Sequence, residues 1–346
     1  MTLQRREMDW LHRKLLARRQ GRAPLSGTLE LTRRCNFSCR HCYLRGTPGP
    51  GRELDTGQVL HLLDQLADAG CLYLGLSGGE PFLRRDMSRI VWHAVSAGML
   101  VTVQTNGSLI DDGLADALAR RPPRRIDISL YGYSEDTYRQ VTGVAGMRNR
   151  VFQAIDRLRQ RGLQVRLNVP LLVPLAGELS RLNDFAAARD IPLRIESTID
   201  PTLGGDRKPC RLRLPADRAA ALEASLSTYH AGDDRGDSDR RSGCQAGRQG
   251  FYIDAAGGLR PCVHLIEPRR DVLAEGFSAA WRRLEGFSPP RLDSAACGDC
   301  AHAQLCSACP LMARGEDAPG PGSFYCRLAR ERSRLRRHHQ QEVGAA

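Results

Sequence analysis

The sequence predicts an α/β fold, a parallel sheet covered by helices, followed by a small cysteine-rich domain. Three observations lead to this prediction. Short apolar runs alternate with amphipathic helical patterns from residue 28 to about 196, polar and glycine-rich motifs follow those runs, and seven of the twelve cysteines fall in the last 103 residues. Alternating strand and helix patterns are typical of parallel sheets, because a crossover helix returns the chain to the same edge.

Six apolar runs are the expected strands, at residues 28–32, 72–77, 100–105, 125–130, 165–169 and 193–196. Between them, apolar residues recur on one helical face, which predicts helices at about 59–67, 87–97, 111–119, 151–158 and 178–188. Periodicity alone does not decide whether the sheet is open or curled into a barrel. Further helices are expected at about 215–230 and in the basic tail from residue 327.

Changes in composition suggest the domain boundaries. We expect an N-terminal helical segment at 1–27, the α/β domain at 28–230, a Gly- and Asp-rich linker at 231–243, and a cysteine-rich domain with its basic tail at 244–346. The N-terminus lacks the apolar core of a secretory signal, and no apolar run reaches 18 residues. We therefore expect a cytoplasmic protein without a membrane span.

The net charge of +12 derives largely from arginine. No recognition helix, zinc-finger spacing or aromatic-interleaved basic stripe accompanies it, so we do not expect a nucleic-acid partner. An arginine-rich composition explains the charge, and attraction to an acidic peptide or redox partner is the alternative. Twelve cysteines in a reducing compartment indicate metal or redox chemistry rather than disulfides.

Cys35, Cys39 and Cys42 form a tight triplet with spacings of three and two residues. Three thiolates can hold one side of an iron–sulfur cube and leave one iron open to a small molecule. The alternatives are three unrelated cysteines or a zinc site completed by His41, although the first spacing fits the usual zinc pairs poorly. The flanking arginines at 33, 34 and 40 are expected to lower the pKa of these thiols.

Further polar motifs follow later strands, with Gly78, Gly79 and Glu80 after the second and Asn106 after the third, while Ser129 ends the fourth. The carboxyl ends of parallel strands share one edge, where such folds bind ligands. Glycines let a backbone approach a ligand closely, and a carboxylate can accept a bond from an ammonium group. Ordinary turn residues are the alternative at each position.

The triplet, followed by an aromatic residue, resembles the signature of the radical SAM superfamily, and Leu76–Pro81 resembles its GGEP motif. The resemblance extends from about Thr28 to Cys326. It implies an enzyme, a radical SAM oxidoreductase with a partial (β/α)6 barrel of the TIM type. It also implies that a 4Fe-4S cluster binds S-adenosylmethionine (SAM), whose reductive cleavage gives a 5'-deoxyadenosyl radical that removes a substrate hydrogen.

The resemblance also implies the SAM contacts. It places the methionine amino group on the GGEP residues, the adenine near the aromatic residue, the ribose near Asn106 and the methionine carboxylate near Arg139. The full implied set is Tyr43, Gly78, Gly79, Glu80, Asn106, Ser129 and Arg139. Asn168 and Glu196, at the ends of later strands, are candidates for a catalytic role. Tyr131 stands where many members carry Asp, so a role of that acid does not transfer.

The later cysteines resemble the SPASM extension of the superfamily, which carries auxiliary 4Fe-4S clusters. The implied ligands of one cluster are Cys297, Cys300, Cys306 and Cys326. Those of the second are Cys244, Cys262 and Cys309, which leaves it one ligand short. Cys210, a carboxylate, water or a substrate atom remain alternatives for the fourth ligand, and a four-cysteine zinc ribbon is the alternative for 297–309. The sequence departs from the pattern in having two residues, not three, between Cys306 and Cys309.

Segments such as Ile128–Gly132 and Thr137–Gly143 look most like maturases of ribosomally made peptides. This resemblance implies a precursor peptide as substrate, crosslinked or oxidised, with a separate leader-recognition protein or a short leader. A flavodoxin or ferredoxin is the expected electron donor. The alternatives are a tetrapyrrole-modifying enzyme of the haem pathway, a sulfatase maturase, an alcohol-oxidising enzyme and a non-catalytic iron–sulfur electron carrier. The substrate, the bond formed and the oligomeric state stay open.

Overall fold

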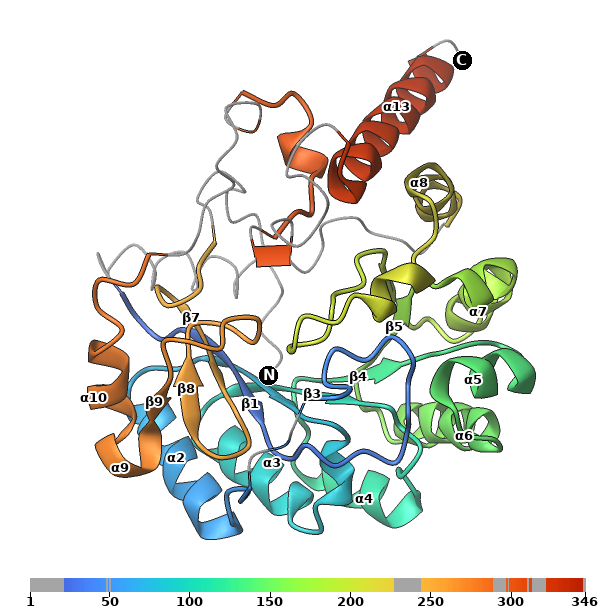
Figure 1. Cartoon of the computed structure of the whole chain (residues 1–346). Coiled ribbons are helices and arrows are strands. Elements are labelled where there is room, and N and C mark those ends of the chain that lie inside the picture. The colour runs from blue at the N-terminus through green and yellow to red at the C-terminus, as the bar shows by residue number, and fades with distance from the viewer. Residues whose placement is uncertain are drawn as a thin grey trace.

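The computed structural model describes residues 22–47, 49, 51–226, 244–288, 297, 299–309, 311–312 and 322–344, with side chains of the last helix described to residue 337. A nine-stranded sheet with the order β6-β5-β4-β3-β2-β1-β7-β8-β9 forms its centre (Figure 1). The first six strands are β1 (Ser26–Glu30), β2 (Tyr73–Ser77), β3 (Leu100–Thr105), β4 (Arg125–Ser129), β5 (Val165–Pro170) and β6 (Leu193–Glu196).

All six predicted strands are confirmed, and each pairs in parallel with the next along the chain. In the described sheet β1 and β6 do not pair with each other, so the six strands form a partial barrel rather than a closed one. The first strand begins two residues earlier than predicted, at Ser26. Alternate residues such as Leu74 and Leu76 are almost fully buried, which fixes the register of the strands.

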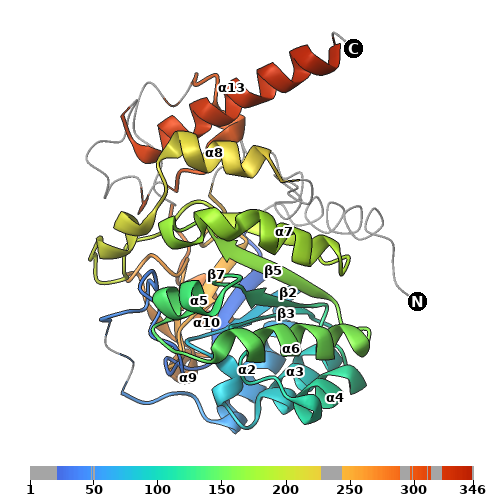
Figure 2. The same cartoon turned by 90° about the vertical axis from the view of Figure 1, so that its right-hand side faces the viewer.

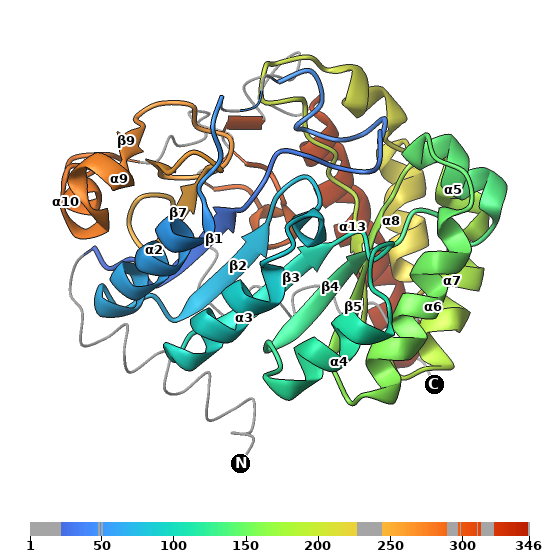
Figure 3. The same ribbon diagram turned by 90° about the horizontal axis from the view of Figure 1, so that it is seen from below.

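Helices cover the outside of these strands (Figure 3). They are α2 (Thr56–Asp68), α3 (Met87–Ser96), α4 (Asp112–Arg120), α5 (Glu135–Thr142), α6 (Met147–Gln160) and α7 (Leu179–Ala187). The five helices predicted from periodicity are confirmed. The sequence reading missed α5, which has only eight residues and is mostly polar, although Ser134 at its N-cap is a recognisable start signal and the left-handed Gly143 is a recognisable stop signal.

The C-terminal region continues the same sheet. Strand β7 (Gly250–Ile253) pairs in parallel with β1, and β8 (Gly258–Arg260) and β9 (Arg270–Asp271) extend the edge antiparallel. This pairing covers the edge of β1, which would otherwise expose unpaired backbone groups. The boundary at 244 stays a prediction, and just beyond it the chain joins the sheet of the preceding domain. Strands of two to four residues are too short for periodicity to reveal.

Two short helices, α9 (Val272–Glu275) and α10 (Phe277–Arg282), follow this edge. Aromatic residues of this region pack together, with ring centroids 5.1 Å apart for Phe251 and Phe277 and 6.1 Å apart for Phe251 and Trp281. Cys71, two residues before β2, is buried in the core, and burial raises the pKa of its thiol to about 12.

The predicted basic helix is confirmed as α13 (Phe324–Gly344), which packs beside α8 (Ala216–Ala224), as Figure 2 shows. Arg332 of α13 donates to both carboxylate oxygens of the buried Glu223 of α8, at 2.7 and 2.6 Å. Part of the predicted N-terminal segment, residues 1–21, lies outside the described residues, and so does the predicted linker at 231–243. Among the described helices, none has the length and apolar character to cross a membrane.

Candidate iron–sulfur and cofactor site

The loop that follows β1 carries the cysteine triplet at the carboxyl edge of the sheet. Cys39 is buried, Cys42 is half-buried and Cys35 is exposed. Burial raises the pKa of all three thiols, and their mutual repulsion as thiolates adds to the rise for Cys39. The sequence predicted the opposite, namely that the flanking arginines would lower the pKa of these thiols. Arg33 does lower the pKa of Cys42, but burial raises it by more. The three free thiols are therefore neighbours on one loop, with Cys39 and Cys42 shielded from solvent and Cys35 exposed, a donor set that suits ligation of an iron–sulfur cluster.

The two glycines after β2 pack directly on this loop. The amide of Gly79 donates to the carbonyl of Thr32 at 2.7 Å, and the amide of Glu80 donates to that of Arg34 at 2.8 Å. A Cβ atom on Gly78 would lie 2.4 Å from the Thr32 oxygen, and one on Gly79 would lie 2.3 Å from the Arg34 oxygen. Glycine is required here because one backbone approaches another, whereas the sequence suggested approach to a ligand.

Glu80 joins the ends of β2 and β3 from within the protein. Its fully buried carboxylate accepts hydrogen bonds from the amide of Phe82 at 3.0 Å, the hydroxyl of Thr105 at 2.8 Å and the amide of Asn106 at 2.7 Å. Burial raises the pKa of Glu80 to about 7, and the three donors oppose that rise. These three hydrogen bonds are made within the protein, and they position the residues at the ends of β2 and β3.

Asn106 fastens the cluster loop to the end of β3. Its amide nitrogen donates to Asn36 at 2.9 Å, and its oxygen accepts from the amide and hydroxyl of Ser108 at 2.9 and 2.7 Å. Asn36 in turn donates to the Ser108 hydroxyl at 2.8 Å. A hydrogen bond from Asn106 also lowers the pKa of Cys35, against the larger effect of burial. Sequence reasoning missed Asn36 and Ser108, although each lies within two residues of a predicted site residue.

Tyr131 belongs to an aromatic group around Cys39. Its ring lies 6.2 Å from that of Phe37, 5.3 Å from that of His41 and 5.9 Å from that of Tyr138, measured between centroids. Its hydroxyl forms hydrogen bonds with the predicted site residue Ser129 and with the Cys39 thiol. The tyrosine that departs from the expected Asp therefore contributes to the environment of the triplet.

Asn168 lies beside Ser129 in the register of β4 and β5. Its side-chain oxygen is buried and has no hydrogen-bond partner within the described part of the chain. A buried acceptor of this kind at the carboxyl edge is suited to a donor on a bound molecule. Glu196, at the end of β6, is 42% exposed, accepts from Thr198 and lies 3.4 Å from a guanidinium nitrogen of Arg194.

The structure does not bring Arg139 to this group in any contact of the described residues. It lies on α5 with its side chain 63% exposed and pairs with Asp136, one turn earlier on the helix, at 3.7 Å. Its contacts in the described part of the chain are those of a residue on the helix surface.

Tyr43 connects the triplet loop to two other segments. Its carbonyl accepts from the amide of Leu203 at 2.8 Å, and its ring lies 6.3 Å from that of His264. His264 Nε2 lies 3.4 Å from Asp200 Oδ2, in the segment that follows β6. Neither His264 nor Asp200 was singled out from the sequence, and His264 is only two residues from Cys262.

The later cysteines fall into two electrostatic groups. Burial raises the pKa of Cys306, and the thiols of Cys326, Cys300 and Cys297 add to the rise. Burial likewise raises the pKa of Cys262, with additions from Cys309 and Cys244. The two groups have the members that the resemblance implied, and their role as cluster ligands stays a prediction.

The second set has further neighbours. The carboxylate of Asp200 adds to the rise in the pKa of Cys309, whose main cause is burial. The Cys210 thiol lies 3.5 Å from the carbonyl of Ile199, next to Asp200 in the chain. In the described residues, no three His, Cys, Asp or Glu side chains could hold a single metal ion.

Comparison with known proteins gives a family match and relatives that align over most of both chains. Residues 29–178 match the family described as the radical SAM superfamily. The mycofactocin maturase MftC of Mycobacterium ulcerans is 30% identical over 309 residues, which cover 82% of each chain. The AdoMet-dependent heme synthase of Methanosarcina barkeri is 24% identical over 328 residues, which cover 84% of this chain and 92% of the relative.

A solved structure shares the fold at lower identity. The structure titled native anSMEcpe with bound AdoMet and Kp18Cys peptide superposes with a TM-score of 0.72 and 15% identity. The match covers 92% of this chain and 99% of that one.

Proposed function

The chain belongs to the radical SAM superfamily, uses SAM and a 4Fe-4S cluster, and is an enzyme; from this premise we propose that its substrate is a ribosomally made precursor peptide. The observation that carries the chemistry is the loop of Cys35, Cys39 and Cys42, tied by backbone hydrogen bonds to the two glycines after β2. When bound, the cluster and SAM supply an electron and a 5'-deoxyadenosyl radical that abstracts a hydrogen. Binding and positioning of these groups and of the substrate are the roles of the protein's own residues.

The triplet thiolates are the proposed cluster ligands, and residues at the carboxyl ends of the neighbouring strands surround them. Gly78, Gly79, Glu80 and Asn106 hold the loop in place, and Asn106 donates to Cys35. Ser129 and Asn168, side by side on β4 and β5, offer polar atoms to a bound molecule, and the unpaired oxygen of Asn168 supports that role. Tyr43 is the proposed neighbour of the adenine. No contact among the described residues supports a role of Arg139 in binding SAM.

For the later cysteines we propose two auxiliary clusters with the ligand sets given above. The three-cysteine set needs a fourth ligand, and Asp200 is the carboxylate whose charge acts on Cys309. Loops that carry Asp200 and Cys262 meet through the pair of Asp200 with His264. This contact supports a ligand from the barrel for that cluster. A flavodoxin or ferredoxin donor, a cytoplasmic location and a leader-recognition partner remain part of the proposal.

Peptide maturation is supported by the relative named a maturase, which matches most of both chains at 30% identity. The solved structure with a bound peptide has the same fold. The second candidate is modification of a tetrapyrrole, which the heme synthase relative favours because the match covers 92% of its length.

Anaerobic reconstitution with iron, sulfide and SAM, followed by a strong reductant, tests both candidates. Mass spectrometry should detect 5'-deoxyadenosine and a precursor peptide lighter by two hydrogens. Product formation with a carboxylated porphyrin precursor but with no peptide would replace the first candidate by the second. A reduced, cluster-loaded protein that never cleaves SAM would contradict the enzyme assignment and favour an electron carrier.

A further inference from the structure

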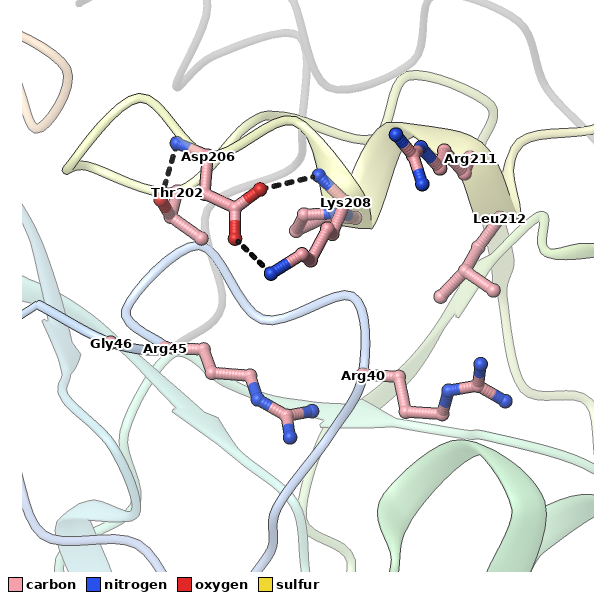
Figure 4. Close-up of a pocket in the computed structure, with 9 residues that line it drawn as sticks. Arg40, Arg45, Gly46, Thr202, Asp206, Lys208, Arg211 and Leu212 are labelled. Carbon is pink, nitrogen blue, oxygen red and sulfur yellow. Dashed lines mark hydrogen bonds and ion pairs between the residues drawn. The ribbon is translucent and has the colours of Figure 1, made fainter.

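A cavity of about 500 Å³ opens beside the triplet loop (Figure 4). One wall is the loop of residues 40–46, and the other is the segment 202–212 that follows β6. The hydrogen bond from the Leu203 amide to the Tyr43 carbonyl joins the two walls. The cavity is therefore built by the loops after the first and last strands of the barrel.

The lining of this cavity is strongly basic. It contains the four cations Arg40, Arg45, Lys208 and Arg211 and a single carboxylate, Asp206. Asp206 is already used locally, since it lies 3.5 Å from the Lys208 ammonium and accepts from the Lys208 amide at 3.0 Å. Across the described residues, none of the three arginines has a salt-bridge partner.

Some other arginines on this surface do pair with carboxylates in the described part of the chain. Arg161, for example, pairs with Asp112 and Asp116, and Arg189 pairs with Asp156. In Figure 4, Arg40 and Arg45 extend from one wall, and Lys208 and Arg211 belong to the other. A negatively charged group placed between the walls would meet donors from both sides.

The position of the cavity connects it to the triplet. Arg40 lies between Cys39 and Cys42 in the chain, and the Arg45 amide donates to the Cys42 carbonyl at 3.2 Å. An anion held here would lie beside the loop that carries the proposed cluster. A basic site at this place suits an anchor for the substrate.

We propose that this cavity binds carboxylate groups of the substrate. The proposal rests on the proposed function, because it concerns the substrate of the same site. Guanidinium groups match carboxylates with paired hydrogen bonds, and the net charge of +12 attracts anions from a distance. The carboxylates can come from Asp, Glu or the C-terminus of a precursor peptide, or from the side chains of a tetrapyrrole.

The test measures binding to the reconstituted full-length protein by fluorescence anisotropy and absorbance. The probes are a labelled Glu-Gly repeat peptide, its Gln-Gly counterpart, a porphyrin tetracarboxylate and its tetramethyl ester. Wild-type protein should bind at least one carboxylate probe and not its neutral counterpart, and higher ionic strength should weaken the binding. The double variant Arg40→Gln/Arg211→Gln should weaken it at least about tenfold, because each wall loses a charged donor.

Arg120→Gln is the matched control, because Arg120 is an exposed arginine at the end of α4 outside the cavity lining. It should bind the probes as wild type does, and thermal unfolding should verify that all variants fold. Binding of the peptide alone, or of the porphyrin alone, identifies the source of the carboxylates.

Equal affinity in the double variant, equal affinity for neutral probes, or no binding of any probe would overturn the proposal. The binding assay requires neither reductant nor SAM cleavage. Failure of the cavity proposal would therefore leave 5'-deoxyadenosine formation unaffected. Failure of the wild-type protein to form 5'-deoxyadenosine would instead overturn the proposed function.

Discussion

The triplet loop and the C-terminal cysteine segment position their thiols in contrasting ways. The loop is fixed by hydrogen bonds to the barrel, through the backbone at Gly79 and the side chains of Asn36 and Asn106. The described part of residues 297–309 has one three-residue 3-10 helix and a few local turns. Arg332 connects it to α13, donating to the Leu305 carbonyl at 3.0 Å and to the Ser307 hydroxyl at 3.3 Å.

This difference indicates that the protein itself forms the first site, while the second depends more on what its thiols bind. A metal centre that joins poorly connected segments contributes its binding energy to folding. A site preformed by hydrogen bonds needs less of that contribution. The two regions should therefore respond differently to loss of iron and to single substitutions.

The largest difference is expected in SAM cleavage. Replacing Cys35, Cys39 and Cys42 by Ala should abolish 5'-deoxyadenosine formation, because the cluster that delivers the electron loses its ligands. Cys297→Ala should leave some uncoupled cleavage, since it affects only the proposed auxiliary cluster. Cys71→Ala is the control that removes a buried thiol from the core. Liquid chromatography with mass spectrometry measures the product, and full cleavage by the triplet variant would contradict the site.

Removing iron by chelation should affect the C-terminal segment more than the barrel. Amide hydrogen exchange should rise in residues 299–309 and stay slow in β2 to β5, because the barrel strands are held by backbone pairing and a buried apolar core. Mass spectrometry of peptic fragments locates the change. Equal loss of protection in both regions would mean that the triplet loop is also organised by its metal.

Arg332→Ala should lower the free energy of unfolding by about 3 kcal/mol, because it leaves the Glu223 carboxylate buried and unpaired. Arg336→Ala, an exposed arginine on the same helix, should change it by less than about 0.5 kcal/mol. Chemical denaturation followed by circular dichroism measures both variants. A similar small effect from both would mean that α13 is attached by its apolar contacts alone.

Glu80 should make the free energy of unfolding depend on pH. Its pKa rises from an ordinary value of 4.5 to about 7 in the folded protein, so folding favours the protonated form. The stability from this group is therefore fully present below about pH 4.5 and is lost as the pH rises through 7. The unfolding free energy of wild type relative to Glu80→Gln should fall by on the order of 3 kcal/mol across that window.

Urea denaturation of the metal-free protein at a series of pH values measures this difference. Glu223→Gln is a useful comparison, because that buried carboxylate is paired with Arg332 instead of three neutral donors. A pH-independent difference between wild type and Glu80→Gln would mean that the three hydrogen bonds keep the carboxylate ionised throughout.

The sequence by itself determined the order of six strands and their helices, since apolar periodicity is a local property that survives in any tertiary arrangement. It also determined which thiols and rim residues end each strand, because the carboxyl ends of parallel strands must share an edge. The helix α5 was not predicted because it is short and polar. The strands β7 to β9 were not predicted because two to four residues are too few to show an alternating pattern.

Only the tertiary structure decided how remote segments meet. Tyr252 bonds to Glu30, 222 positions earlier, and Glu30 also pairs with Arg33 at the start of the triplet loop. Similarly, Arg332 finds Glu223 on α8, and Tyr43 meets His264 beside the second cysteine set. Such pairs have no spacing that a local pattern could reveal, because burial and packing of the whole chain bring them together. The same packing builds the basic cavity between the first and last loops of the barrel.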